Sequence, residues 1–196
     1  MELLALLLRL AAPLLAPLLV LAAPATAPEQ LPCPAAGATL VADVAIYAGT
    51  AGGVVSAVAA RRMMGAAARI AIVNPTAHLG GMVSGGLGST DGRDSGGIAH
   101  EFFQRAGGYK FAPSAAERVF DGWANDSALL VAHHCEAVAA QTQGGRIVSL
   151  TTASGGRVTA TAWIDASCKR PLPRLPAALR RTDRAHPGAF PQTRAS

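Results

Sequence analysis

The sequence predicts an α/β fold of three layers, with a parallel sheet, helices on one face of it and a β-meander on the other. A strand, a glycine-containing turn, a helix and a second strand follow one another within residues 40–73. Three later strand-like segments are separated by glycine pairs at 144–145 and 155–156. With 196 residues, 51% hydrophobic and 15% charged, the chain is not a disordered polyelectrolyte, a collagen or a disulfide scaffold.

The first crossover is the most informative segment. Residues 40–47 (LVADVAIY) form an apolar run that suits a buried parallel strand. Apolar residues then recur at helical spacing over residues 52–64, and Gly65 ends the helix. Residues 68–73 form a second strand. This βαβ order is typical of Rossmann-like domains that bind dinucleotides.

The turn over residues 48–53 (AGTAGG) contains small residues throughout. The N-terminus of a helix presents unpaired N–H groups and a positive dipole end, which favour a pyrophosphate. Compared with G-x-G-x-x-G, Ala48 and Thr50 replace the first two glycines, and only Gly53 stays in register. Two interpretations stay open: the turn binds a pyrophosphate, or its small residues only let strand and helix pack closely.

The segment after the second strand is the next candidate. Asn74 occupies the position that usually supplies an acidic side chain to ribose hydroxyls, and an amide can replace the hydrogen bonds but not the charge. Five glycines follow within residues 80–88, which predicts a loop lying against a flat ligand. A flexible linker is the alternative, although the loop is more apolar than solvated linkers tolerate.

The remaining segments complete the expected domain. A helix is predicted over residues 96–106, and a capping box at 114–117 opens another that presents Val119, Phe120 and Trp123 to the core. The expected strands are a third parallel strand at 128–132, a meander at 137–141, 146–152 and 157–161, and a final strand at 162–167.

Three segments, taken in order, resemble a known family. They read YAGTAGGVVSAVAARRMM, IAIVNPTAHLGGMVSGGLGSTD and GGIAHEFFQRAG, and they resemble the N-terminal part of secreted or bacterial FAD-dependent oxidoreductases with a glutathione-reductase-type flavin fold. The resemblance runs over residues 44–167. In that family the first turn usually reads GGTPAG, Glu precedes Pro-Thr, HLGGM lies close to the flavin, and a similar I-D-A-[ST] ends the strand beneath the cofactor.

This resemblance implies a Rossmann-like FAD/NAD(P)-binding domain with FAD as its cofactor. It assigns no catalytic residue, because His78 and Asp91 fit loop-shaping roles better than catalysis. An NAD-binding dehydrogenase would share the βαβ unit but leaves HLGGM unexplained. The residues expected to contact the cofactor are Ala48, Gly49, Thr50, Ala51, Gly52, Gly53, Asn74, Pro75, His78, Gly80, Gly81, Met82 and Ala166.

The N-terminus has the pattern of a secretory signal. Residues 10–23 are apolar behind Arg9, and small residues follow, so we expect a signal peptide over residues 1–25, cut after Ala25, and a linker over 26–39. An uncleaved membrane anchor is the alternative; its prolines and short length disfavour it, and we expect no stable membrane insertion after cleavage. The triplet Asn125-Asp126-Ser127 is a glycosylation acceptor pattern, which also arises by chance.

The cysteines indicate no metal or redox-pair site. Cys33, Cys135 and Cys168 allow one disulfide and leave one thiol, with the pairing open. His133, His134 and Cys135 are adjacent in sequence, but neighbouring side chains on a strand point to opposite faces, so we expect no bound metal.

The C-terminal residues 169–196 differ from the domain over residues 40–168. They are rich in proline and carry seven Lys or Arg against one Asp, a net charge of +6, which predicts a disordered basic tail and leaves the rest of the chain near −1. We expect no nucleic-acid binding, because residues 1–168 are close to neutral and the basic tail lacks interleaved aromatic residues that could stack on bases.

The leading hypothesis is an exported FAD-dependent oxidoreductase in truncated form, holding only an incomplete dinucleotide-binding domain. Relatives continue for hundreds of residues beyond the point where the resemblance stops, at Cys168-Lys169-Arg170. The expected partners are FAD and a small-molecule substrate of unknown identity. The alternative is a non-catalytic fragment, or an incomplete gene model, that keeps the fold without cofactor or turnover.

Overall fold

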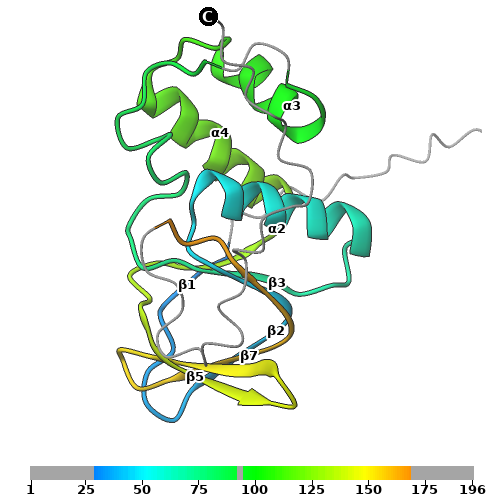
Figure 1. Ribbon diagram of the computed structural model, residues 1–196, viewed down its shortest axis with the longest axis vertical. Coiled ribbons are helices and arrows are strands. Elements are labelled where there is room, and N and C mark those ends of the chain that lie inside the picture. Colours follow the sequence, from blue (N-terminus) through cyan, green and yellow to red (C-terminus); the bar gives the residue numbers. More distant parts are fainter. Residues whose placement is uncertain (1–28, 92–94, 169–196) are drawn as a thin grey trace, which may run out of the picture.

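The architecture is a seven-stranded mixed sheet with three helices packed on one side (Figure 1). The computed structural model describes residues 29–91 and 95–168. The strand order is β1-β4-β3-β2-β7-β6-β5. The strands are β1 (Glu29–Leu31), β2 (Thr39–Tyr47), β3 (Ile70–Val73), β4 (Leu130–Ala132), β5 (Ala137–Gln143), β6 (Arg146–Thr152) and β7 (Arg157–Asp165), and the helices are α2 (Ala51–Met64), α3 (Gly97–Ala106) and α4 (Pro113–Asp126).

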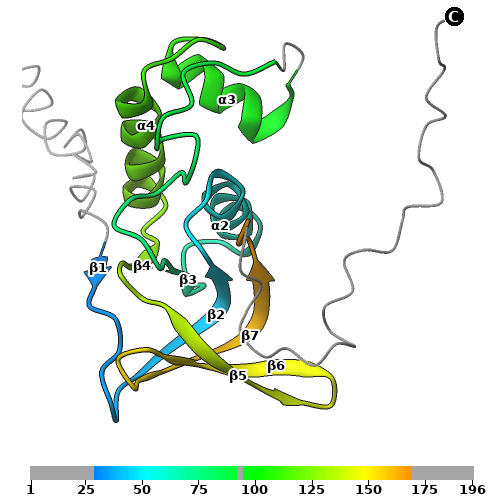
Figure 2. The ribbon, with the colours of Figure 1, turned by 60° about the vertical axis from the view of Figure 1, so that its left-hand side comes forward.

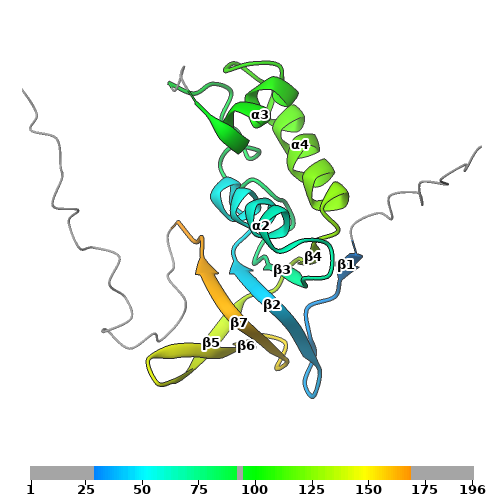
Figure 3. The ribbon, with the colours of Figure 1, turned by 90° about the vertical axis from the view of Figure 1, so that its right-hand side faces the viewer.

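The predicted fold class is confirmed. Strands β1, β4, β3, β2 and β7 pair in parallel, and β6 and β5 continue from β7 in antiparallel order. The β5–β6 hairpin crosses on the far side of the parallel strands from the helices (Figure 2). Residues 157–161 and 162–167 were expected to be two strands. Residues 157–165 form the single strand β7, because no turn residue interrupts them, and residues 166–167 follow its end. Strand β7 therefore belongs to both the meander and the parallel sheet (Figure 3).

The βαβ crossover forms as predicted. Strand β2 pairs in parallel with β3, and α2 connects them. The helix begins after Thr50, whose side chain accepts a hydrogen bond from the N–H of Gly53, and it ends at Gly65, where φ is 82°. Arg61 and Arg62 lie in the last turn, where cations interact favourably with the helix dipole.

Alternate residues of the central strands supply two hydrophobic clusters. Ile46, Ile70 and Ile72 face the helices and pack with Phe120 and Trp123. On the opposite face, Tyr47 and its strand neighbours pack against the hairpin; this cluster includes Ala45, Ala71, Val73, Leu150 and Val158. Burial on both faces explains why β2 and β3 read as nearly continuous apolar runs.

Part of the range expected to be a linker, residues 26–39, is instead built into the sheet. Glu29–Leu31 forms the edge strand β1, which pairs in parallel with β4. Cys33 forms a disulfide with Cys135, 102 residues later, so the thiol left over is that of Cys168. A strand of three residues has too little pattern to be seen in the sequence.

The capping box expected at residues 114–117 is wrong. Helix α4 begins at Pro113, and its N-cap is Ala112, two residues before the expected cap Ser114 and without a side-chain capping bond. Proline fits the first helical position because its fixed φ suits the helix and its missing N–H would have no partner there. Val119, Phe120 and Trp123 do enter the core, as predicted.

Both chain ends lie outside the described residues, and with them the signal peptide expected over 1–25 and the tail expected over 169–196. Within the parts that are described, none of the helices has the length and apolar character needed to cross a bilayer.

Two adjacent glycines at the start of α2, Gly52 and Gly53, provide a matched test of how the turn over residues 48–53 is packed. A Cβ at Gly53 would lie 2.2 Å from the carbonyl oxygen of Ala48, whereas one at Gly52 would meet nothing closer than Thr50 Oγ1 at 3.8 Å. Gly53→Ala should lower the free energy of unfolding by about 1–3 kcal/mol, the usual cost of overpacking. Gly52→Ala should leave it unchanged or raise it by up to about 1 kcal/mol through helix propensity. Urea unfolding of both variants checks this, and a Gly53→Ala protein as stable as Gly52→Ala would contradict the packing of the turn.

Candidate dinucleotide site

A pocket of about 420 Å³ lies at the carboxyl edge of the parallel strands. Three segments line it: the first turns of α2, the loop that follows β3, and the end of β7. The parallel pairing of β2 with β7 aligns Tyr47 with Asp165, so the residues after both strands meet at one edge (Figure 3). Ligand sites of open α/β sheets lie at this edge.

The pocket brings together six of the thirteen residues predicted to contact the cofactor, namely Thr50, Ala51, Gly52, Gly80, Met82 and Ala166. The other seven, which do not line it, are Ala48, Gly49, Gly53, Asn74, Pro75, His78 and Gly81. Five more residues complete the lining: Ser56, Val83, Ile164, Asp165 and Cys168. Ile164 and Asp165 belong to the I-D-A-[ST] motif that the resemblance implied beneath the cofactor, although only Ala166 of that motif was predicted to contact it. No signal in the sequence pointed to the other three.

Thr50 holds the two sides of the pocket together. Its hydroxyl donates a hydrogen bond of 2.9 Å to the carbonyl of Ala166 and accepts one of 3.1 Å from the N–H of Gly53. Thr50 also forms a parallel bridge with Gly80. The threonine thus satisfies one N–H of the helix start itself. The first two N–H groups of the helix belong to Ala51 and Gly52, and both residues line the pocket.

The small residues of the turn divide into two groups with different roles. A Cβ at Gly49 would lie 2.6 Å from Leu79 Cδ2 and 2.9 Å from Asn74 Cγ, and one at Gly53 would strike the Ala48 carbonyl. Gly49 and Gly53 are therefore small because protein packs against them. Ala51 and Gly52 instead face the pocket. Close packing therefore explains the small size of Gly49 and Gly53, whereas Ala51 and Gly52 leave space for a ligand.

Ala48 occupies the position of the first family glycine and has a left-handed backbone, with φ at 77°. This region suits glycine, which has no Cβ. Here the alanine is 8% exposed, its N–H donates to the Val73 carbonyl, and its conformation is held by the surrounding strands. A backbone conformation that glycine adopts most easily is therefore held at a position where this chain has alanine.

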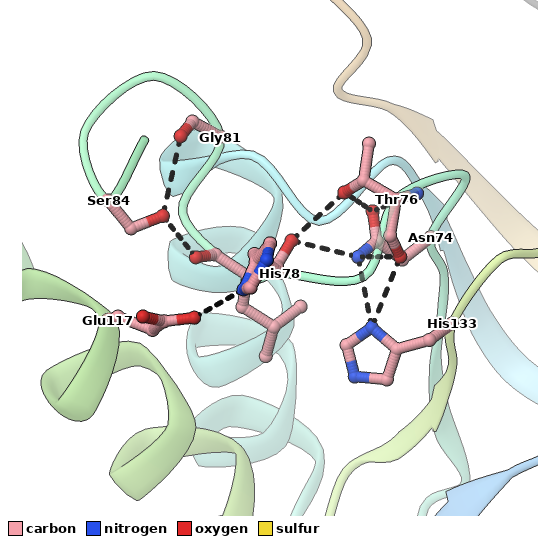
Figure 4. Close-up of polar contacts among 8 residues, drawn as sticks. Asn74, Thr76, His78, Gly81, Ser84, Glu117 and His133 are labelled. Carbon is pink, nitrogen blue, oxygen red and sulfur yellow. Dashed lines mark hydrogen bonds and ion pairs between the residues drawn. The ribbon is translucent and has the colours of Figure 1, made fainter. Parts of the chain in front are cut away.

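Asn74 is buried, at 2% exposure, and its amide is bonded to protein on both ends (Figure 4). Its Oδ1 accepts hydrogen bonds from the N–H of Gly49 at 3.1 Å and the hydroxyl of Thr76 at 3.2 Å. Its Nδ2 donates to the carbonyls of Thr76 and His78, both at 3.0 Å. A ribose contact by Asn74 stays a prediction, and such a contact would have to share or displace these bonds.

The loop after β3 is held by specific bonds, unlike a flexible linker. Gly80 donates its N–H to the Gly49 carbonyl at 2.7 Å, and the hydroxyl of Ser84 donates to the Leu79 carbonyl at 2.5 Å (Figure 4). Gly80 has a φ of 99°, and a Cβ there would lie 2.4 Å from Phe120. Leu79, 2% exposed, anchors the loop in the core.

His78 lies on the outside of this loop. Its Nδ1 is 2.5 Å from Oε1 of Glu117 on α4, and its side chain is 70% exposed. Asp91 is exposed and, like His78, does not line the pocket. The loop-shaping roles expected for these two residues stay predictions.

Among the described residues that line the pocket, Asp165 has the one formally charged side chain. Its carboxylate accepts a hydrogen bond of 3.0 Å from the N–H of Ser167. A carboxylate repels a diphosphate but accepts hydrogen bonds from sugar hydroxyls. The pocket therefore has a helix N-terminus that suits an anion at one side and an acceptor that suits hydroxyls at the other.

Within the described part of the chain, no three His, Cys, Asp or Glu residues are grouped so as to hold a metal ion. In the triplet at 133–135, Cys135 is joined to Cys33 by the disulfide. His133 Nδ1 lies 3.2 Å from Asn74 Nδ2 and 3.3 Å from the Thr76 carbonyl, on the outer side of the same network.

Solved structures of flavoproteins share this fold. The myxobacterial chondrochloren halogenase CndH, a variant of FAD-dependent halogenases, is 15% identical with a TM-score of 0.50, over 67% of this chain and 38% of that one. A flavin-containing monooxygenase from Stenotrophomonas maltophilia is 19% identical with a TM-score of 0.47, over 65% and 38%. Thioredoxin reductase from T. acidophilum is 18% identical with a TM-score of 0.47, over 64% and 34%.

The chain thus spans 34–38% of the length of these three structures. No curated protein sequence matches it. The family model described as FAD dependent oxidoreductase matches residues 43–176, which is most of the chain and includes the βαβ crossover, the loop after β3 and strand β7. The cofactor of that family is FAD, and the chain belongs to the FAD dependent oxidoreductase family.

Proposed function

We propose that this chain is the N-terminal dinucleotide-binding part of an exported FAD-dependent oxidoreductase. The observation that carries the proposal is the pocket at the start of α2, which is lined by Ala51 and Gly52, the first two residues of the helix, and where an added Cβ at Gly52 would meet nothing closer than 3.8 Å. The family match over residues 43–176 supports FAD as the ligand. The whole enzyme's reaction and substrate belong to segments that this chain, spanning about a third of its structural neighbours, does not supply.

The residues present fit the central part of FAD. The volume of about 420 Å³ is within the range of small-molecule sites, roughly 300–1,000 Å³, but FAD has two large halves joined at its diphosphate. The diphosphate would meet the first turn of α2, and Asp165 would accept hydrogen bonds from hydroxyls next to it. Gly80 and Met82 would lie beside the flavin half. FAD, when bound, supplies the electron-transfer chemistry, while these residues hold and orient it.

A second candidate is a form that keeps the fold without holding FAD. Two contacts favour it: Thr50 satisfies the N–H of Gly53 internally, and the amide of Asn74 is saturated by protein groups. Both reduce what the turn can offer a ligand. A direct titration separates the two candidates.

FAD titration of the purified chain from Thr26 onward tests the proposal, with flavin fluorescence and absorbance as the readouts. The wild type should bind FAD saturably. Gly52→Asp should weaken binding at least about tenfold, because a carboxylate added beside the diphosphate repels it, while an acidic residue in the first turn of a helix does not lower its stability. Met63→Asp, on an 87% exposed residue near the other end of α2, is the matched control and should bind like the wild type.

A wild type without saturable binding would favour the fragment that lacks a cofactor. Equal affinity of Gly52→Asp and wild type for FAD would contradict the proposal that the diphosphate binds at the first turn of α2.

Export is part of the proposal, and three features support it. The first 25 residues have the pattern of a signal peptide, and Asn125-Asp126-Ser127 is a glycosylation acceptor pattern. Cys33 and Cys135 form a disulfide, which persists mainly in oxidising compartments. An uncleaved anchor is the alternative.

Expression of the full chain in a secreting host should therefore yield a soluble protein that starts at Thr26. Intact mass spectrometry without reduction should show Cys33 and Cys135 joined and Cys168 reduced. A protein that keeps residues 1–25 and sediments with membranes would contradict cleavage and favour the anchor.

A further inference from the structure

The glycosylation acceptor pattern at residues 125–127 lies where α4 ends. Asn125 is in the last turn of the helix, and Ser127 is its C-cap. Asparagine followed two residues later by serine or threonine is the pattern that receives an N-linked oligosaccharide, except where proline lies between them. The chain has two asparagines, and the other one, Asn74, is followed by proline and threonine. The two asparagines can therefore be compared within one fold.

The side-chain amide of Asn125 has its oxygen on the inside. Asn125 as a whole is half-buried, and its Oδ1 is buried without a hydrogen-bond partner among the described residues. Its Nδ2 hydrogen-bonds to no described group either, and unlike Oδ1 it is not buried. N-linked sugars are attached to Nδ2. The atom that would carry the sugar is therefore the accessible atom of the amide.

Asn74 has the opposite environment. It is 2% exposed, and its Nδ2 donates to the carbonyls of Thr76 and His78, both at 3.0 Å. A sugar on this nitrogen would replace one of its two hydrogens, so a buried carbonyl would lose its donor. At Asn125 a sugar displaces no hydrogen bond to a described group. The fold therefore accepts a sugar on Asn125 and excludes one on Asn74.

The backbone around the acceptor pattern is held independently of the Asn125 side chain. Arg61 of α2 donates from Nε to the Ser127 carbonyl at 2.8 Å and from Nη2 to the Ala128 carbonyl at 2.9 Å. The N–H of Ala128 donates to the Asn125 carbonyl at 2.9 Å. A substituent on Asn125 Nδ2 therefore leaves in place the bonds that end the helix.

The acceptor pattern is also remote from the dinucleotide pocket. Ala51 and Gly52, in the first turn of α2, line that pocket, whereas Arg61 lies in the last turn of the same helix. Gly52 and Arg61 are separated by about 14 Å along the helix axis, since each residue of an α-helix adds about 1.5 Å. A sugar on Asn125 therefore begins at the opposite end of α2 from the cofactor site.

We propose that Asn125 carries an N-linked oligosaccharide in the exported chain, an inference that rests on the proposed export. The donor is a lipid-linked diphospho-oligosaccharide. The bond between C1 of its first sugar and the diphosphate breaks, and a bond from that C1 to Asn125 Nδ2 forms. The lipid diphosphate leaves, Nδ2 gives one proton to the solvent, and nothing is oxidised or reduced. The transfer takes place before α4 forms, and the folded chain then holds the sugar at its surface.

Cell-free translation with endoplasmic-reticulum microsomes measures entry and modification separately. Two forms of the chain are compared, one with its own residues 1–25 and one in which an established cleavable signal peptide replaces them. Protection from added protease reports entry, and a gel shift that peptide N-glycosidase removes reports the sugar. Chains that enter should carry one glycan, and peptide mapping should place it at Asn125, because the enzyme leaves aspartate where it removes a sugar. Asn74 is the internal control and should stay unmodified.

Two substitutions of Ser127 form a matched pair. Ser127→Thr keeps the acceptor pattern and should carry the glycan like the wild type, whereas Ser127→Ala removes the pattern and should abolish it. The side chain of Ser127 hydrogen-bonds to no described group, so neither substitution breaks a bond. After secretion from a eukaryotic host, the glycosylated wild type and the unglycosylated Ser127→Ala protein should have the same midpoint of urea unfolding.

Protected chains of the replaced-signal form that carry no sugar on Asn125 would overturn the proposal, as would a glycan that persists in Ser127→Ala. A glycosylated wild type that unfolds at a lower urea concentration than Ser127→Ala would overturn the surface position of Nδ2. If only the replaced-signal form enters and is modified, export through residues 1–25 is contradicted, while the acceptor role of Asn125 is supported.

Discussion

The side-chain amide of Asn74 joins the segments on which the site depends. It lies at the end of β3, accepts from the N–H of Gly49 in the turn after β2, and donates to the carbonyls of Thr76 and His78 in the loop after β3. Its backbone N–H donates to Ala132 of β4, and its backbone carbonyl accepts from Cys135. One buried residue therefore fixes how three parallel strands and their following loops meet. A buried amide has this effect because each unmade bond would leave a polar group without a partner.

This arrangement decides which groups can face a ligand. Since Asn74 and Leu79 pack tightly against Gly49, the turn is pressed against the loop, and its side chains from Thr50 onward are directed to the pocket edge. Thr50 then connects the turn to the end of β7 through the Ala166 carbonyl. The turn gains internal stability from these bonds and gives up one N–H that a glycine-rich turn would leave for the diphosphate. Ala51 and Gly52, whose N–H groups are the first two of the helix, still line the pocket.

The sequence was informative where local chemistry decides the structure. The apolar run of β2, the small turn and the Gly65 stop predicted the crossover nearly to the residue, and the apolar residues of α4 predicted its buried face. Long-range pairing was not visible. Strand β1 is three residues long, and the partner of Cys33 lies 102 residues away. The motif that contains Asp165 was visible, but the register of β7 on β2, which brings this side chain to the pocket, was not. The glycines were also ambiguous in sequence, because Gly49 and Gly53 serve packing while Gly52 faces open space.

The most direct test of this account replaces Asn74 with the acidic residue type that the family pattern has at this position. The family pattern has glutamate there, and aspartate is used because it is the acid with the shape of asparagine. In Asn74→Asp, one carboxylate oxygen can still accept from Gly49, but the other faces the carbonyls of Thr76 and His78 and donates nothing. Burial and the two carbonyls should raise the pKa of the new carboxyl group, so its ionised form is disfavoured in the folded state. Urea unfolding should show a loss of at least about 2 kcal/mol at pH 8 and a smaller loss at pH 4.5, where the group can be protonated. The exposed substitution Gln143→Glu should show neither change. A fully stable Asn74→Asp protein that binds FAD more tightly than the wild type would contradict the account. It would indicate that residue 74 contacts the ribose of the cofactor and does not fix the turn and the loop.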